Sequence, residues 1–326
     1  MSTKNTINNS KNVKGIKTQN LGKKPSVLVI LGPTSGGKTA LAVQLAADLD
    51  GEIISADSRQ VYRGLDVGSG KDLNEYTVNG RKIAYHLIDV VRPEERFDLA
   101  QYQKLANRAI ADILRRHKLP IIVGGSGLYL QALVDNYRLA ETKPDFAARN
   151  KLEKLSAAQL FSRLEKIKPD FAARLNNSDR NNPRRLARYI EISQSGGAVN
   201  LKQESPYDFL VLGKDCPDKT LRGKIVQRLL VMLEKEGLLA EVHNLNKAGL
   251  SWERLDSFGL EYRFASRHLR GEMSYSEMVD KLGTTVYQFA KRQRTWFKRW
   301  EKQGQEIIWI KNLAGARKAI AKNLFQ

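Results

Sequence analysis

A short strand, a glycine-rich loop and a helix follow one another near the start of the chain, and this arrangement constrains the fold most. The apolar run "SVLVILG" ends at Gly32, and the segment "KTALAVQLAADL" begins at Lys38. Leu41, Leu45 and Leu49 recur at intervals of four, so one face of the expected helix is apolar. A buried strand that turns through glycines into a helix is typical of α/β proteins with a parallel sheet.

The loop itself satisfies the pattern G-x-x-x-x-G-K-[ST] through Gly32, Gly37, Lys38 and Thr39. Between a strand and a helix, consecutive backbone N–H groups and the helix dipole surround a phosphate. Lys38 adds a positive charge, and Thr39 supplies a hydroxyl for Mg²⁺. The motif therefore predicts a site for phosphoanhydride oxygens, and it leaves open which molecule carries them.

Strands and helices continue to alternate as far as about residue 140. The run "EIIS" and the run "LPIIVGGSG" are expected strands, and helices are expected within 99–117 and at "LYLQALV". From about Thr142 the chain becomes helical and strongly charged until "YDFLVLGKD" provides another strand. We expect an α/β fold with a P-loop NTPase-like parallel sheet flanked by helices and a small all-helical insertion domain. The expected divisions are a disordered basic tail (1–24), the first part of the P-loop core (25–140), the helical insertion (141–205), and the core completion with C-terminal helices (206–326).

The charge balance favours a polyanionic partner. The chain has 55 Lys and Arg against 35 Asp and Glu, a formal charge of +20, which promotes binding to phosphate backbones through counterion release. A single cysteine, Cys216, excludes an internal disulfide and a cysteine-based zinc site. No apolar run approaches the roughly 20 residues of a membrane span, and no secretory signal is recognisable. We therefore expect a cytoplasmic protein with no membrane partner.

Two polar residues follow the expected strands at the edge where open α/β sheets bind ligands. Asp57 comes just after "EIIS", where a carboxylate can hold Mg²⁺ through water, accept a proton from an attacking nucleophile, or cap the following segment. Ser126 follows "LPIIVGG", where its hydroxyl can touch a substrate or make a hydrogen bond within the turn. Residue type and position leave these alternatives open.

Two basic groups occur in the second half of the chain. Arg180, Arg184, Arg185 and Arg188 fall within nine residues, which suits either an RNA backbone or a solvated helix face. The segment "AKRQRTWFKRW", 290–300, mixes cations with Trp and Phe. Its aromatics are suited either to contact with nucleic acid or to packing against the core. The four histidines have no metal-ligand spacing.

Six segments in order resemble the tRNA dimethylallyltransferases, also called tRNA isopentenyltransferases. They are "GPTSGGKT", "ISADSRQVYRGLDVGSGK", "HLIDV", "LPIIVGGSGLYLQAL", "NNPRRLARYIEI" and "AKRQRTWFKRW", and the resemblance runs from about residue 27 to 310. It implies transfer of a dimethylallyl group from dimethylallyl pyrophosphate to N6 of adenosine 37 in tRNA, with release of pyrophosphate. It also implies Mg²⁺, the tRNA anticodon stem-loop as partner, and a monomer.

The resemblance assigns roles to individual residues of this sequence. It implies that Asp57 is the base that takes the proton of the adenine amine, with Lys38, Thr39 and Arg228 also catalytic and Thr39 holding the metal. The implied pyrophosphate site is Gly32, Pro33, Thr34, Ser35, Gly36, Gly37, Lys38, Thr39 and Arg228. The implied tRNA contacts are Asp57, Ser58, Arg59, Gln60, Ser126, Arg184, Arg185, Leu186, Ala187 and Arg188.

The sequence departs from the family pattern at three places. Gly36 is an added glycine in the phosphate loop, Ser126 stands where Thr is usual, and Gly259-Leu260-Glu261 replaces Gly-Tyr-Arg/Lys. The last change removes the basis for an RNA contact there. The zinc finger of eukaryotic relatives has no counterpart, which favours a bacterial-type enzyme.

Three alternatives remain. A P-loop kinase would use the loop for ATP, an adenylate isopentenyltransferase would modify a free nucleotide, and an RNA-binding protein would have a catalytically idle loop. The arginine-bearing insertion favours tRNA over a free nucleotide. Intact Lys38, Thr39 and Asp57 favour an enzyme.

Overall fold

A six-stranded parallel sheet organises the protein. The computed structural model describes residues 24–139, 152, 154–194 and 202–324, so the expected tail lies outside the described residues except for Lys24. The strand order is β5-β2-β6-β1-β7-β8, and every neighbouring pair is parallel. The strands are β1 Ser26–Leu31, β2 Gly51–Ser55, β5 Tyr85–His86, β6 Leu119–Gly124, β7 Asp208–Lys214 and β8 Ile308–Ile310. The expected parallel sheet is confirmed.

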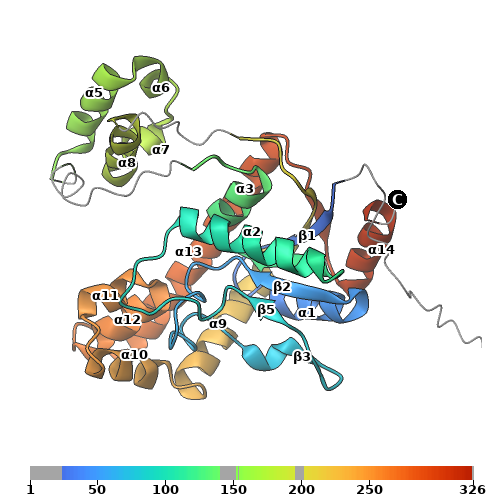
Figure 1. Ribbon diagram of the computed structural model, residues 1–326. Coiled ribbons are helices and arrows are strands. Elements are labelled where there is room, and N and C mark those ends of the chain that lie inside the picture. Colours follow the sequence, from blue (N-terminus) through green and yellow to red (C-terminus); the bar gives the residue numbers. More distant parts are fainter. Residues whose placement is uncertain (1–23, 140–151, 153, 195–201, 325–326) are drawn as a thin grey trace, which may run out of the picture.

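Helices cover both faces of the sheet because alternate side chains of each strand point in opposite directions. Val27 and Val29 of β1 pack with helices α2 (Leu99–Arg115) and α3 (Gly127–Val134) and with Phe297. Leu28 and Ile30 pack on the other face with helices α1 (Lys38–Leu49) and α14 (Leu313–Asn323). Figure 1 shows α1 and α2 on opposite sides of the strands.

A second lobe of helices lies beside the sheet and shares a core with the segment that follows β2. Val61 and Leu65 of that segment are fully buried in this core. The lobe consists of α9 Asp218–Glu234, α10 Leu238–Lys247, α11 Trp252–Ser257, α12 Leu260–Leu269 and α13 Tyr275–Lys302. The small elements between β2 and β5 are the 3₁₀ turn η1 Leu73–Tyr76 and the hairpin of β3 Thr77–Val78 and β4 Arg81–Lys82.

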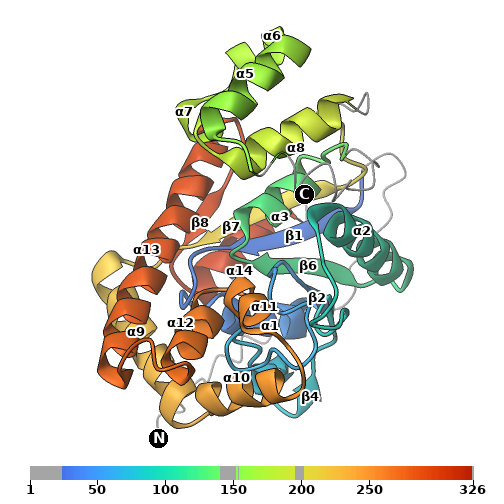
Figure 2. The ribbon, with the colours of Figure 1, turned by 90° about the vertical axis from the view of Figure 1, so that its left-hand side faces the viewer.

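The helices between α3 and β7 have a core of their own. Leu160, Leu164, Leu186 and Ile190 are fully buried together there. The helices are α5 Ala157–Ile167, α6 Pro169–Ala173, α7 Asn177–Arg180 and α8 Pro183–Gln194. Figures 1 and 2 show them as a separate body at one end of the molecule.

Of the two interpretations of the aromatics in "AKRQRTWFKRW", packing against the core is the one that the structure shows. Phe297 and Trp300 are fully buried in the core on one face of the sheet. Trp296 lies against the backbone at Gly127 and donates its indole N–H to Gln131 Oε1 at 3.1 Å. Packing against the core therefore explains these aromatics.

Among the helices that the structure describes, none is both long and apolar enough to cross a bilayer.

A buried carboxylate stabilises the end of the sheet opposite the loops described below. Glu52 at the start of β2 is 2 % exposed, and its carboxylate pairs with Arg116, with Lys118 Nζ at 3.0 Å and with His86 Nε2 at 2.8 Å. The hydrogen bond from Arg116 is the main cause that lowers the pKa of Glu52 to about 2, against the effect of burial. Folding is therefore coupled to ionisation of this group.

We expect Glu52→Gln to lower the free energy of unfolding by about 2 kcal/mol at pH 7, because it weakens charge-assisted hydrogen bonds. The stabilisation by Glu52 is complete above the ordinary glutamate pKa of 4.5 and is lost as the pH falls toward 2. Urea unfolding at pH 7 and pH 3 measures both effects, and the difference from wild type should shrink at pH 3. Glu94→Gln, at an exposed position, is the control. Equal unfolding free energies for wild type and Glu52→Gln at pH 7 would exclude this role.

Candidate active site

Three predicted site segments meet at one edge of the sheet because they follow three neighbouring parallel strands. The phosphate loop follows β1, Asp57 follows β2, and Ser126 follows β6, which lies between them. The amide of Ala56 donates to Val123 O at 2.7 Å, and the amide of Ser126 donates to Ala56 O at 3.4 Å. The ends of β2 and β6 are thus joined by backbone hydrogen bonds at the site.

The phosphate loop is shaped by two residues with positive φ angles and by a hydrogen bond from Lys38. Ser35 and Gly37 have φ angles of 56° and 80°, and α1 begins immediately after Gly37. Lys38 Nζ donates to Pro33 O at 2.7 Å, so its side chain turns back over the loop. Burial lowers the pKa of Lys38 to about 8, whereas the charge of Asp57 acts in the opposite direction. Lys38 and the carboxylate therefore face the same small region.

Asp57 accepts a hydrogen bond from the amide of Arg59 at 2.8 Å through Oδ1. The third of its expected roles, capping of the following segment, is therefore present in the structure. The other two roles use the second oxygen, for which no partner is recorded among the described residues. Beside it, Gln60 accepts from Ser55 Oγ at 2.8 Å and donates to Gly70 O at 3.2 Å, which makes Gln60 part of the local framework.

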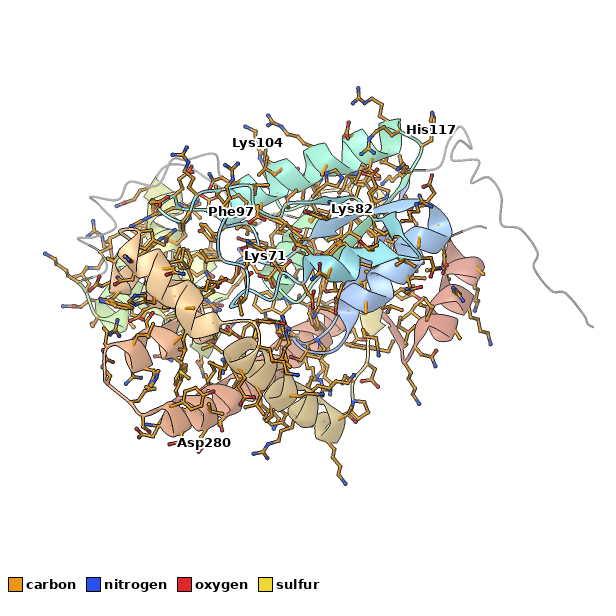
Figure 3. All side chains as sticks on the ribbon, turned by 90° about the horizontal axis from the view of Figure 1, so that it is seen from below. Lys71, Lys82, Phe97, Lys104, His117 and Asp280 are labelled. Carbon is orange, nitrogen blue, oxygen red and sulfur yellow. The ribbon has the colours of Figure 1, made fainter. Side chains whose placement is uncertain are left out.

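The segment after Asp57 is held by a buried lysine. Lys71 has a fully buried side chain, and its ammonium donates to Tyr62 O at 2.6 Å and pairs with Asp66 at 2.9 Å and Asp89 at 2.5 Å. Figure 3 labels Lys71 in the interior of the view, whereas Lys104 and Asp280 lie at its margin. Because all three ammonium protons are used, Lys71 fixes the loop and is not a free cation for phosphate.

Glu241 on α10 holds the same segment from the helical lobe. Its carboxylate accepts the amides of Asp66 at 2.9 Å, Val67 at 2.7 Å and Gly68 at 3.1 Å. The hydroxyl of Tyr262 donates to it at 2.8 Å. Successive amides converging on one carboxylate form a strong charge-assisted contact. Sequence reasoning missed Lys71 and Glu241 because their partners are fixed only by the fold.

The structure does not bring Arg228 into contact with the phosphate loop. Arg228 lies on α9, and its guanidinium pairs with Glu236 at 2.5 Å. Its charge also lowers the pKa of Glu75, which burial raises overall. Among the described residues, the recorded hydrogen bonds of Arg228 are confined to Glu236.

Ser126 occupies the position before α3 and makes no side-chain cap. The expected turn hydrogen bond of its hydroxyl is absent among the recorded contacts of the described residues, which leaves the hydroxyl open to a ligand. A residue that was not predicted lies beside it. Gln293 of α13 accepts from the amide of Thr34 at 2.8 Å and donates to Gly125 O at 3.0 Å.

Three of the four predicted arginines lie on α8 of the insertion, away from the sheet edge (Figure 2), whereas Arg180 ends α7 and donates to Leu175 O at 2.9 Å and Ala173 O at 3.1 Å. Arg184 is exposed, whereas Arg185 pairs with Asp179 at 2.7 Å and Arg188 with Glu191 at 2.9 Å. Leu186 and Ala187 are buried in the insertion core, so their side chains face away from any RNA. Helical spacing places Leu186 across the helix from Arg184, whereas the small Ala187 lies at the border of the buried face.

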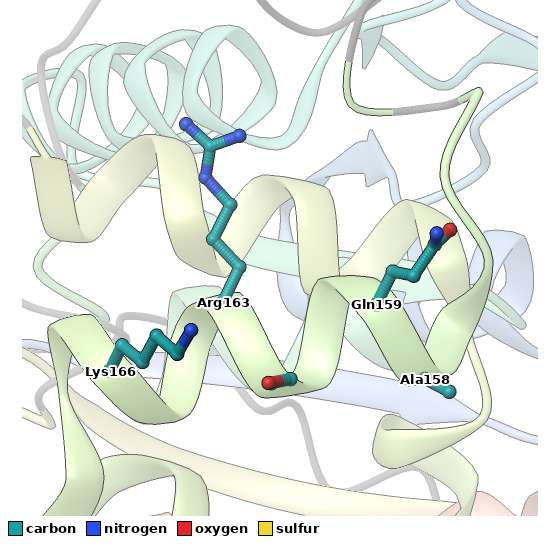
Figure 4. A pocket seen from close by; sticks show the side chains of 5 residues that line it. Ala158, Gln159, Arg163 and Lys166 are labelled. Atoms are coloured by element: carbon teal, nitrogen blue, oxygen red, sulfur yellow. The ribbon is translucent and has the colours of Figure 1, made fainter.

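A shallow hollow lies on the same insertion, along α5. It is lined by Ala158, Gln159, Ser162, Arg163 and Lys166. Figure 4 shows Arg163 and Lys166 extending from the helix beside it. The hollow carries positive charge but none of the residues of the phosphate loop.

Glu261 places a second carboxyl group at the sheet-edge site. A Cβ atom added at Gly259 would lie 3.5 Å from Arg59 Nε and 3.8 Å from Glu261 Oε2, so both side chains flank this backbone. Burial raises the pKa of Glu261 to about 7, the charge of Asp57 raises it further, and Arg59 lowers it. The departure noted at Gly259-Leu260-Glu261 thus puts an ionisable acid close to Asp57 and Arg59.

Comparisons with known proteins decide the family. The sequence model of the family described as IPP transferase matches residues 60–300. A protein named tRNA dimethylallyltransferase 1 from Syntrophus aciditrophicus is 45% identical over 289 residues, covering 87% of this chain and 93% of the relative. The chain belongs to the IPP transferase family.

Solved structures of this family share the fold. The tRNA isopentenylpyrophosphate transferase of Bacillus halodurans is 33% identical with a TM-score of 0.62, and the match covers 88% of this chain and 89% of that one. A eukaryotic dimethylallyltransferase, described as acting on tRNA, is 27% identical with a TM-score of 0.72, covering 91% and 78%. The IPP transferase match begins at Gln60, so the phosphate loop is an observation independent of it.

We expect Glu261→Gln to stabilise the protein at pH 8 by on the order of 1–2 kcal/mol, because it removes a partly buried carboxylate charge. In the wild type the pKa is raised from 4.5 to about 7, so stability falls as the pH rises through this range. Urea unfolding at pH 5 and pH 8 measures the effect, and the two proteins should converge at pH 5. A constant difference at both pH values would contradict it.

Proposed function

We propose that this enzyme transfers a dimethylallyl group from dimethylallyl pyrophosphate to N6 of adenosine 37 in tRNA and releases pyrophosphate. One observation carries the proposal: the phosphate loop and Asp57 follow β1 and β2, the parallel strands on either side of β6, and so lie at one edge of the sheet, where the charge of Asp57 opposes the lowering of the Lys38 pKa by burial. A proton acceptor and an anion-binding loop thus share one edge of the sheet. Family membership and relatives named tRNA dimethylallyltransferases support the choice of substrates.

The donor diphosphate binds the loop Gly32–Thr39. As the allylic carbon leaves, negative charge grows on the diphosphate, and Lys38 with the loop amides is oriented to stabilise that charge. Arg228 joins this site only after it exchanges its Glu236 partner for the diphosphate. Preorganised charge of this kind is usually the largest contribution to catalysis.

The loop also suits Mg²⁺ in the manner of a phosphate-bound metal. Mg²⁺ is commonly held by one or two protein oxygens together with substrate phosphates. Thr39 offers a hydroxyl in the first turn of α1, and among the described residues no group of three or more acidic, His or Cys side chains forms a protein cage. When bound, the ion would neutralise charge on the diphosphate.

The acceptor adenine reaches the site from the Asp57 side. An exocyclic amine is a poor nucleophile because its lone pair is delocalised, so a base that takes its proton lowers the barrier. Asp57 accepts that proton through the oxygen that does not bind the Arg59 amide. The adenine is surrounded by Ser58, Arg59, Gln60 and Ser126. It leaves the anticodon-loop stack at a cost of a few kcal/mol.

The tRNA anticodon stem contacts the insertion. Arg184, Arg185 and Arg188 lie on one helix, and the net charge of +20 attracts the backbone. The protein works as a cytoplasmic monomer in this proposal.

The decisive experiment incubates the protein with radiolabelled dimethylallyl pyrophosphate and parallel samples of bulk tRNA and AMP. Label in tRNA alone is the expected result. Label in AMP would instead identify an adenylate isopentenyltransferase. Thermal stabilisation by ATP together with phosphate transfer, and none by the prenyl donor, would identify a kinase.

We expect Asp57→Ala to lower prenyl transfer at least about a hundredfold, because it removes the general base. Its affinity for tRNA should remain close to that of wild type, since the RNA is held mainly by contacts with the backbone. Single-turnover assays and filter binding measure the two quantities. Equal activity in the variant and the wild type would remove the assignment of the base.

We expect Arg184→Ala to weaken tRNA binding roughly fivefold, about 1 kcal/mol, and to reduce the salt slope by about one. Arg185→Ala should have a smaller effect because Asp179 already neutralises much of that charge. Binding measured across a salt titration compares the two. If neither variant changes the slope, the helix face is merely solvated.

A further inference from the structure

In the described part of the structure, Gln293 is the one residue whose side chain is hydrogen-bonded both to the phosphate loop Gly32–Thr39 and to the turn after β6, residues 125–127. In the proposed reaction the first is the donor loop and the second is the acceptor turn. Gln293 Oε1 accepts the Thr34 amide at 2.8 Å, and its Nε2 donates to Gly125 O at 3.0 Å. Thr34 belongs to the phosphate loop after β1, whereas Gly125 precedes Ser126 after β6. We propose that Gln293 is a positioning residue that sets the spacing between the donor and the acceptor.

The environment of Gln293 leaves its amide little freedom. It is 8 % exposed and lies on the buried face of α13 with Ala290, Phe297 and Trp300, which are fully buried. Because this helix face is anchored in the core, the amide is held at a fixed position against both loops. The two hydrogen bonds also fix its orientation, with the oxygen toward Thr34 and the nitrogen toward Gly125.

The glycines of "VGGSG" make this contact possible. A Cβ atom at Gly125 would come within 2.4 Å of Gln293 Nε2, and one at Gly127 within 2.4 Å of Trp296. Both distances are too short for real atoms. The acceptor turn therefore packs its bare backbone directly against α13, and two helical positions three residues apart, Gln293 and Trp296, define where that turn lies.

A second consequence concerns the amides of the donor loop. The Thr34 N–H is already bonded to Gln293, so it is not among the free donors for the diphosphate. Removal of the Gln293 amide should therefore leave most of the diphosphate affinity intact. What it disturbs is the relative position of two bound substrates, and errors of about 1 Å in such positions can cost a hundredfold in rate.

The test compares Gln293→Met with Gln288→Met. Methionine is close to glutamine in size but removes both hydrogen bonds, and Gln288 is an exposed residue of the same helix. We expect Gln293→Met to lower kcat at saturating donor and tRNA at least tenfold, with the Kd for inorganic pyrophosphate changed less than threefold. Gln288→Met should match the wild type. Rates are normalised to the folded fraction from circular dichroism, since a merely structural role would change that fraction and not the normalised kcat.

Gln293→Glu provides a second variant if the methionine variant does not fold. It keeps an acceptor for the Thr34 amide but opposes a carboxylate to Gly125 O, so one of the two links is broken. We expect a tenfold or greater loss of normalised kcat here as well. A normalised kcat within threefold of wild type in a folded Gln293 variant, or a loss confined to donor KM, would overturn the positioning role.

This inference rests on the proposed function, and the two can fail separately. If the wild type transfers no dimethylallyl group to tRNA, the proposed function fails whatever the variants do. If the wild type is active and a folded Gln293 variant is equally active, only the positioning role fails.

Discussion

The placement of β6 between β1 and β2 is the constraint on which the site depends. Neighbouring parallel strands lie about 4.8 Å apart, so the phosphate loop and Asp57 are separated by two such spacings, with the Ser126 turn between them. In the proposed reaction this gap accommodates the reacting carbon between the diphosphate and the base.

The sheet places the starts of these loops, but the helical lobe gives them rigidity. The segment after Asp57 has only an isolated bridge from Tyr62 to Val91 and no regular strand until β3. Its conformation depends instead on Lys71 from within and on Glu241 from α10. Buried polar contacts of this kind specify one loop geometry when every partner is satisfied. The segment after Asp57 is therefore coupled to the helical lobe, and the phosphate loop is coupled to it as well, through Gln293 of α13.

Sequence reasoning predicts the parts of the fold that have a regular pattern. The strand β1 and the helix α1 follow from an apolar run and from leucines four apart; α1 has the bounds of the expected helix, and β1 ends one residue before the expected Gly32. The strands β5 and β8 have only two and three residues, which is too short to show the alternation of apolar and polar residues that identifies a strand. They form because β2 and β7 offer unpaired backbone groups with which they can pair. The same limit applies to Gln293, whose partner Thr34 is 259 residues away. In the sequence, the one local sign of its role is that Gln293 lies three residues after Ala290 and four before Phe297, on the face of the helix that is buried.

The distribution of charge in this strongly basic protein agrees with the proposed reaction. In that reaction the target is the neutral amine of an adenine, which must lose a proton, so a carboxylate is useful next to it and a cation is not. The phosphates of the RNA must then be bound elsewhere, because they would be repelled by Asp57 and by ionised Glu261. The exposed Arg184 lies on α8, in the body of helices that has its own core (Figure 2). In the proposed reaction, attraction of the RNA backbone and deprotonation of the adenine amine therefore take place on different elements, α8 and the edge of the sheet.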